Sequence, residues 1–143
     1  MDPTKVLIVD DEQEFAAALS ERLEARGFRV DTAATGDDAA KKVQDRGYDA
    51  ILLDLVMPGM DGIETLKRLL QVRPELQIIL LTGHATLEKG IQAVKLGALD
   101  FLEKPADFDQ LLQRIEAAKS NRLALVEKKC EDTIEQLLMK KPW

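Results

Sequence analysis

Short runs of apolar residues alternate along this 143-residue chain with longer stretches that have helical spacing. Most of the runs are rich in Val, Ile and Leu and are bounded by polar residues, which is typical of buried strands. Five strands are predicted in this way: Val6–Val9, Phe28–Ala33, Ala50–Leu53, Leu76–Leu81 and Leu99–Leu102.

The stretches that follow these runs predict five helices. Apolar residues recur in them three and four positions apart, as at Phe15, Leu19 and Leu23. Asp107 is placed to act as the N-cap of the last helix. Glycines are predicted to end three of the helices, namely Gly27, Gly47 and Gly97.

The alternation of strands and helices predicts an α/β fold, with one doubly wound, five-stranded parallel sheet and helices on both faces. The first, third and fourth strands are apolar at nearly every position, as strands covered on both faces must be. In such folds a ligand binds at the carboxyl ends of the strands, where the chain order reverses beside the first strand. We therefore expect the functional site at that edge of the sheet.

Five polar residues stand where the predicted strands end. Asp10 and Asp11 follow the first strand, Asp54 the third, Thr82 the fourth and Lys104 the fifth. Because the carboxyl ends of parallel strands meet at one edge, these side chains are expected to converge on one site. Aspartates after a strand can also simply begin a helix, where they complement its dipole. That alternative does not account for Asp54 and Lys104 on other strands.

Three carboxylates in one site repel one another. Two of them about 5 Å apart repel by roughly 3 kcal/mol at an effective dielectric of ~20. A cation relieves this repulsion, and a site with only oxygen ligands favours Mg²⁺ over zinc. Mg²⁺ commonly bridges carboxylates to a phosphoryl group, and Lys104 is placed to neutralise phosphoryl oxygens. Asp54 is the candidate nucleophile for phosphoryl transfer, and Thr82 is a candidate donor to the transferred group.

Composition narrows the function classes further. The net charge is −6, whereas residues 119–143 hold six of the 20 basic and four of the 26 acidic residues and so carry +2. An acidic body argues against direct binding of nucleic acid. One histidine and one cysteine make a zinc site implausible, and the single cysteine predicts a cytoplasmic protein without an internal disulfide. No apolar stretch approaches the roughly 18 residues of a membrane span.

Four sequence pieces carry a family resemblance. They are VLIVDDE (6–12), LLDLVMPGMDG (52–62), LLTGHA (80–85) and DFLEKP (100–105). In this order, at the ends of four strands, they resemble the receiver domain of bacterial two-component response regulators over about residues 4–118. The resemblance implies a flavodoxin-like sheet with the strand order 2-1-3-4-5.

The resemblance also implies a role for each matching residue. Asp54 resembles the phosphoacceptor. The implied Mg²⁺ ligands are Asp10, Asp11, Asp54 and the backbone carbonyl of Val56. The implied phosphoryl-binding and switch residues are Thr82, Lys104 and Phe101, and the peptide bond before Pro105 is implied to be cis. The implied phosphodonor is a sensor histidine kinase or a histidine phosphotransfer protein.

Taken together, these features predict a phosphorylation-activated signalling switch that takes part in its own phosphorylation and dephosphorylation, rather than an enzyme that turns over a metabolite. One alternative is a Mg²⁺-dependent phosphatase with Asp54 as its nucleophile. Such enzymes usually place a second acid two residues after the nucleophile, where this chain has Val56. Another alternative is a receiver-like binding module that is never phosphorylated, but the complete set of polar residues argues against it.

Residues 119–143 are predicted to form a C-terminal helical extension of the domain at residues 4–118. A stripe with heptad spacing runs along the extension through Leu123, Val126, Cys130, Thr133 and Leu137. Three interpretations remain open. The helix packs back on its own domain, it pairs with a second copy together with the surface of the fourth helix, fifth strand and fifth helix, or it begins a linker to an output domain.

Overall fold

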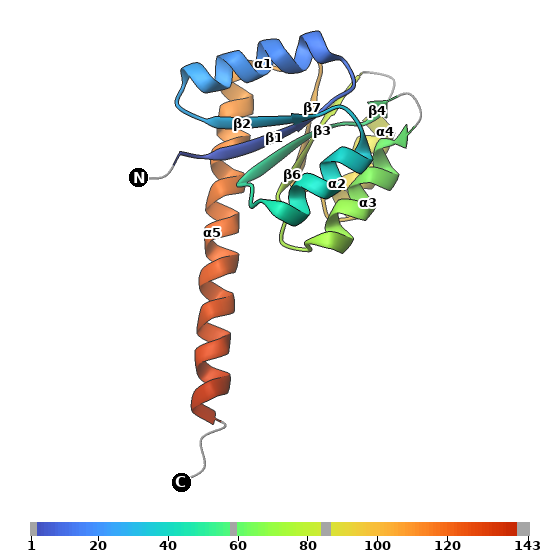
Figure 1. Cartoon of the computed structure of the whole chain (residues 1–143). Helices are drawn as coiled ribbons and strands as arrows, with labels where there is room; N and C mark the ends of the chain where they lie inside the picture. Colours follow the sequence, from blue (N-terminus) through green and yellow to red (C-terminus); the bar gives the residue numbers. More distant parts are fainter. Residues whose placement is uncertain (1–2, 58–59, 84–86, 140–143) are drawn as a thin grey trace.

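Strands and helices alternate along the computed structural model, which describes residues 3–57, 60–83 and 87–139 (Figure 1). The strands are β1 (Lys5–Val9), β2 (Arg29–Ala33), β3 (Ala50–Asp54), β4 (Val56–Met57), β5 (Met60–Asp61), β6 (Ile78–Thr82) and β7 (Asp100–Glu103). The helices are α1 (Gln13–Ala25), α2 (Gly36–Asp45), α3 (Gly62–Val72), α4 (Leu87–Lys95) and α5 (Phe108–Met139).

The five longer strands form one parallel sheet in the order β2-β1-β3-β6-β7. Counted along the chain without the two short strands, this is the predicted order 2-1-3-4-5. Val9 at the end of β1 lies beside Leu53 of β3, and Asp54 lies beside Leu81 of β6. The central strands therefore end at the same edge of the sheet.

Each central strand supplies side chains to two separate cores. Leu7, Ile51 and Leu80 pack with α2, α3 and α4, whereas Ile8 and Leu52 pack with α1 and α5. Neighbouring residues of a strand point to opposite faces, so a sheet covered on both sides buries all of them. Figure 1 shows the same layers, with α1 and α5 on one side of the sheet and α2, α3 and α4 on the other.

The segment between β3 and α3 contains two short strands. Strands β4 and β5 pair antiparallel, with Val56 opposite Asp61. Strands of two residues leave no apolar pattern in a sequence, because the alternation that marks a strand needs at least four residues. The apolar pattern of the sequence therefore does not predict this pair of strands.

The glycines predicted to end helices behave differently from one another. Gly27 and Gly97 have positive φ angles of 90° and 121°, so their prediction as helix ends is confirmed. Gly47 stands at the equivalent place, two residues after α2 ends at Asp45, but its φ angle is not positive and the preceding Arg46 is extended, so the prediction of a glycine cap there was wrong. A Cβ atom at Gly47 would lie 2.7 Å from Nη2 of Arg122, so glycine at this position leaves room for a guanidinium from α5.

Helix α5 is much longer than the domain that it covers. Its first turns bury Leu111, Ile115 and Ala118 against the sheet. The helix then continues without a break through the predicted domain boundary, and it extends away from the sheet (Figure 1). The large apolar side chains of this extension are exposed: Leu123, Leu125, Val126, Ile134, Leu137 and Leu138. The interpretation in which the extension packs back on its own domain is therefore wrong.

No helix within the described residues, α5 included, combines the length and the apolar character that crossing a lipid bilayer requires.

A polar cluster joins the edge strand β2 to the start of β3. The buried Tyr48 hydroxyl donates to Oδ2 of Asp31 at 2.7 Å, and Nη1 of Arg46 donates to the same oxygen at 3.0 Å. Burial by itself raises the pKa of Asp31, but the two hydrogen bonds together with the positive charges of Arg46 and Lys42 outweigh it and hold that pKa below its usual value. Burial, followed by the bond to Asp31, raises the pKa of Tyr48 well above its usual value.

Replacement of Tyr48 by Phe tests this cluster. We expect Tyr48→Phe to lower the free energy of unfolding at pH 7 by about 1 kcal/mol, since one hydrogen bond to a charged group is lost. The lowered pKa of Asp31 means that this bond stabilises the fold above the ordinary pKa of 3.8 and weakens as the pH falls below it. Urea unfolding of both proteins between pH 7 and pH 3 should show the difference shrinking at the acid end. A difference that is constant with pH would contradict the account.

Candidate functional site

The predicted site residues converge at the carboxyl edge of the sheet. Asp10 and Asp11 directly follow β1, Asp54 is the last residue of β3, and Thr82 is the last residue of β6. Lys104 directly follows β7, and its backbone N–H donates to the carbonyl of Thr82 at 2.7 Å. Four strand ends thus supply the five polar side chains, because parallel strands in register end together.

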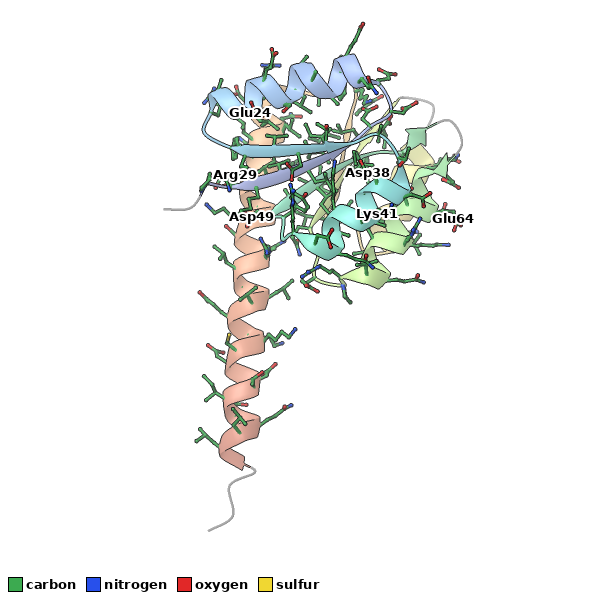
Figure 2. All side chains as sticks on the ribbon, viewed as in Figure 1. Glu24, Arg29, Asp38, Lys41, Asp49 and Glu64 are labelled. Carbon is green, nitrogen blue, oxygen red and sulfur yellow. The ribbon has the colours of Figure 1, made fainter. Side chains whose placement is uncertain are left out.

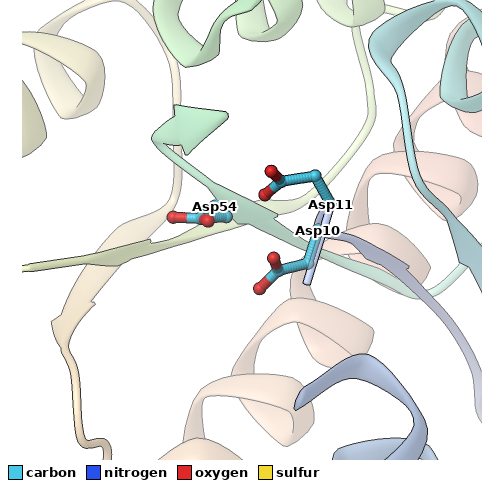
Figure 3. A group of neighbouring side chains, drawn as sticks. All are labelled: Asp10, Asp11 and Asp54. Atoms are coloured by element: carbon cyan, nitrogen blue, oxygen red, sulfur yellow. The ribbon is translucent and has the colours of Figure 1, made fainter. Parts of the chain in front are cut away.

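The three aspartates form one compact acidic cluster. One carboxylate oxygen from each of Asp10, Asp11 and Asp54 lies within 4.8 Å of the other two. Figure 3 shows the three side chains gathered at the ends of β1 and β3. Asp10 and Asp54 are only 2% and 6% exposed, while Asp11 is half-buried. Burial reduces the screening by water, so the repulsion inside this cluster is strong.

Lys104 supplies the opposing positive charge. Its Nζ lies 3.2 Å from Oδ2 of Asp10 and 3.6 Å from Oδ2 of Asp54. The same Nζ lies 4.3 Å from the centre of the Phe15 ring, so the ammonium also makes a cation–π contact. The peptide bond between Lys104 and Pro105 is cis. With three carboxylates and one ammonium, the cluster keeps a net charge of −2.

Asp10 has both of its oxygens engaged within the chain. Oδ1 accepts the backbone N–H of Glu12 at 2.9 Å, and Oδ2 faces Lys104. These contacts fix the carboxylate at the start of the loop that leads into α1. Asp10 is thus held as a fixed charge beside Asp54.

The Thr82 hydroxyl has an unusual environment. Thr82 is fully buried, and its Oγ1 has no hydrogen-bond partner among the described residues. A buried hydroxyl without a partner is destabilising by about 1–3 kcal/mol, so such groups usually mark a ligand site or a functional role. Since Thr82 ends the strand next to Asp54, an acceptor bound at Asp54 is the natural partner for this hydroxyl.

Phe101 packs beside Thr82 against a glycine of α4. A Cβ atom at Gly90 would lie 3.3 Å from two atoms of the Phe101 ring and 3.4 Å from Cγ2 of Thr82. Phe101 is half-buried and lies against the core on the α4 side of the sheet. The aromatic ring, the threonine and α4 are therefore in mutual contact, so a movement of Thr82 would change the packing of α4.

The short segment between Asp54 and α3 closes back on itself at Gly62. The backbone N–H of Gly62 donates to the carbonyl of Leu55 at 3.2 Å. A Cβ atom at Gly62 would lie 2.5 Å from both Cα and O of Leu55, a distance that no side chain tolerates. Asp61 caps α3 by accepting the N–H of Ile63 at 2.9 Å. Glycine at position 62 therefore allows the chain to turn directly beside the acidic cluster.

Two residues of the site were missed by sequence reasoning. The apolar pattern places Phe15 only on the buried face of its helix, and it predicts no role for Gly90. Both act through contacts between elements far apart in the chain, and neither residue type signals such a contact in a single sequence. The backbone carbonyl of Val56 stays a predicted ligand at the start of β4.

This arrangement suits a hard cation and a phosphoryl group. The cluster offers only oxygen ligands, carries excess negative charge and has one ammonium at its side, which fits Mg²⁺. The orphaned hydroxyl of Thr82 and the ammonium of Lys104 are both donors that can serve the oxygens of a bound phosphoryl group.

The comparison with protein families agrees with this chemistry. A family model described as the response regulator receiver domain matches residues 6–116. The transcriptional regulatory protein ZraR of Salmonella typhimurium is 38% identical over 113 residues, which make up 79% of this chain and 26% of that protein. The chain therefore spans about a quarter of the length of this curated relative.

Two solved structures are similar over most of the chain. A response regulator receiver domain protein from Clostridium thermocellum superposes with a TM-score of 0.82 at 29% identity, covering 85% of this chain and 98% of that one. A structure described as adenylate cyclase from Rhodopirellula baltica gives a TM-score of 0.83 at 27% identity, covering 98% of this chain and 100% of that one.

Substitution of two glycines near the site separates crowding from loss of flexibility. We expect Gly62→Ala to lower the free energy of unfolding by about 2 kcal/mol or more, because its Cβ overlaps the Leu55 backbone. Gly83→Ala is the matched control, since a Cβ atom there meets nothing within 4 Å, and it should change stability by less than about 0.5 kcal/mol. Denaturant unfolding measures both, and equal effects would show that the close approach at position 62 is unimportant.

Proposed function

Because the chain belongs to the response regulator receiver family, we propose that it is a switch in which Asp54 accepts a phosphoryl group with the help of Mg²⁺. The observation that carries this proposal is the acidic cluster of Asp10, Asp11 and Asp54 with Lys104 beside it. The phosphorylated form would present a changed surface to an output partner.

Asp54 is the best placed of the three aspartates to accept the group. It ends β3, which lies between β1 and β6, so Asp10 flanks it on one side and Thr82 on the other. The carboxylate of Asp10 accepts the backbone N–H of Glu12 and pairs with the ammonium of Lys104. These contacts support a positioning and charge-balancing role for Asp10. A group on Asp54 would thus lie between the other carboxylates and the two donors.

The proposed reaction is a transfer from a phosphohistidine of a sensor histidine kinase or a histidine phosphotransfer protein. A carboxylate oxygen of Asp54 attacks phosphorus, the bond from phosphorus to the histidine nitrogen breaks, and the imidazole departs with that electron pair. The ammonium of Lys104 offsets charge on the transferring oxygens, and the hydroxyl of Thr82 donates to one of them. Water would later attack the same phosphorus and return Asp54 to its carboxylate.

The resident cation would be held by the carboxylates of Asp10, Asp11 and Asp54 and by the carbonyl of Val56. When bound, Mg²⁺ would lower the charge repulsion between the incoming phosphoryl group and the cluster. The aspartates perform the positioning, since their backbone is fixed by the sheet.

The proposal extends to partners and compartment. The kinase or phosphotransfer protein would meet this chain in the cytoplasm, as the single cysteine predicts. A second copy of the chain is proposed as a further partner through α4, β7 and α5 with its extension, where Ile91 and Val94 of α4 are exposed. The relative ZraR is a transcriptional regulatory protein, and we propose that the output of this switch is likewise regulatory rather than the turnover of a phosphate ester.

Intact mass tests the phosphoacceptor. We expect incubation with acetyl phosphate and Mg²⁺ to add roughly 80 Da to the chain, the mass of one phosphoryl group. Asp54→Asn should abolish this gain, and removal of divalent metal should abolish it in the native chain. Asp61→Asn is the matched control, because asparagine can still cap α3 and the gain should persist. A gain that survives in Asp54→Asn would refute the assignment, and steady release of phosphate from phosphate esters would favour a phosphatase.

Replacement of Thr82 by Val separates switching from stability. The hydroxyl of Thr82 is buried without a partner, so Thr82→Val should leave the free energy of unfolding unchanged or raise it by about 1 kcal/mol. Phosphorylation should then shift the NMR signals of Phe101 and α4 much less than in the native chain, since the donor is gone. Thr65→Val is the matched control, because Oγ1 of this buried threonine donates to the carbonyl of Asp61 and its loss should be destabilising. Undiminished shifts in Thr82→Val would contradict the role of Thr82.

A further inference from the structure

The extension of α5 leaves a long apolar stripe uncovered. Its seam residues are Leu123, Val126, Cys130, Thr133 and Leu137, with Ile134 and Leu138 beside them. All seven side chains are exposed, and the aliphatic ones are 47–63% exposed. On a helix these positions share one side, while Lys128, Asp132 and Glu135 lie on the other. Figure 2 shows side chains standing out from this part of the helix with no other element beside it.

The extension has a fixed exit direction from the domain. Nη1 of Arg122 lies 2.9 Å from Oδ1 of Asp49, and the other oxygen of Asp49 accepts the backbone N–H of Lys5 at 2.9 Å. The guanidinium also occupies the space left by Gly47. Residues 108–139 contain no glycine or proline, so nothing in the helix favours a bend beyond this anchor. The described residues of this chain therefore leave the stripe exposed.

The chemistry of the stripe favours one kind of partner. Residues 119–143 carry six basic and four acidic side chains, a net charge of only +2, so the extension offers little positive charge to attract nucleic acid. Its polar side has both signs of charge and its apolar side has no aromatic residue, unlike helices that bind lipid surfaces. Heptad spacing with charged flanks is instead the pattern by which two helices pair. We propose that a second copy of this chain covers the stripe, as a parallel helical pair in register.

The parallel register follows from the seam itself. In a parallel pair each seam residue meets its own copy, so all five positions are matched. Two antiparallel registers place a seam leucine opposite a lysine, either Leu137 opposite Lys119 or Leu123 opposite Lys140. A third would bring Leu137 opposite Leu112, which packs against the core of the domain. Thr133 is compatible with the seam, because its hydroxyl donates to the carbonyl of Lys129 at 2.8 Å and needs no partner across the interface.

The pairing is of limited strength. Seven half-exposed side chains offer on the order of 400 Å² per chain, about half of the ~800 Å² that each partner buries in a standard interface. A cavity of about 540 Å³ adjoins the seam, and the second helix would narrow it. Its lining includes the seam residues Val126, Cys130 and Thr133 and also Leu125, Lys129, Ile134 and Glu75. The pair should therefore form in a concentration-dependent way. This inference gives a geometry to the homodimer proposed above and rests on that proposal, but it does not need phosphorylation of Asp54.

The single cysteine of the chain is a built-in probe of this geometry. In a parallel pair in register, Cys130 meets Cys130 of the second copy, with Cα atoms within about the 4.4–6.8 Å that a disulfide requires. Oxidation of the full chain with diamide, which takes up the two electrons and two protons of the thiols, should yield a disulfide-linked dimer. The matched control is the chain with Cys130→Ser and Lys128→Cys, whose thiol lies on the opposite side of the helix and should cross-link at least about tenfold more slowly.

Sedimentation equilibrium of two neighbouring variants completes the test. Val126 and Leu125 are similarly exposed, at 47% and 44%, but only Val126 belongs to the seam. Val126→Lys should raise the dissociation constant by about tenfold or more, whereas Leu125→Lys should leave it within about twofold. Equal weakening by both variants, equal cross-linking from positions 128 and 130, or a monomer at all concentrations would overturn the proposal. Asp54→Asn should pair like the native chain, because Asp54 is not part of the seam. A native chain that is phosphorylated on Asp54 but does not pair would refute the pairing and leave the proposed function standing.

Discussion

Mutual repulsion of three carboxylates is the constraint around which this structure is organised. Asp10, Asp11 and Asp54 are held within 4.8 Å of one another at the end of a buried sheet, where water screens them poorly. Lys104 offsets part of that charge from a fourth strand end. The remaining negative charge favours a divalent cation, and the cation in turn favours a phosphoryl group. The proposed switch thus follows from electrostatic strain built into the fold.

The sheet can hold these repelling carboxylates close together because each site residue is fixed by its own strand. Parallel strands in register end at one edge, so each side chain is held by a separate strand and its own core contacts. The close approach of Gly62 to Leu55 shapes the turn that follows Asp54. Thr82, Phe101 and Gly90 then connect the site to α4, so a new acceptor at Asp54 has a short physical route to the surface.

Sequence reasoning succeeded where local pattern carries the information. Buried strands such as Ile51–Leu53 are apolar throughout, so the strands, their alternation with helices and the convergence of their last residues could all be predicted. It failed at the two-residue strands β4 and β5, which are too short for a pattern, and at Gly47, which makes room for Arg122 from a distant helix. The contact of Phe15 with Lys104 was also missed, because it joins residues far apart in the chain. Whether the heptad stripe of α5 folds back could not be read from the stripe, since an apolar face looks the same whatever covers it.

The central claim is that the phosphoryl group resides on Asp54, and chemical mapping of the modified residue tests it most directly. Borohydride reduces an aspartyl phosphate to homoserine, which peptide mass spectrometry can locate. After treatment with acetyl phosphate, the account predicts homoserine at position 54 alone, and only when Mg²⁺ is present. Homoserine at position 10 or 11, or none in any sample, would contradict it.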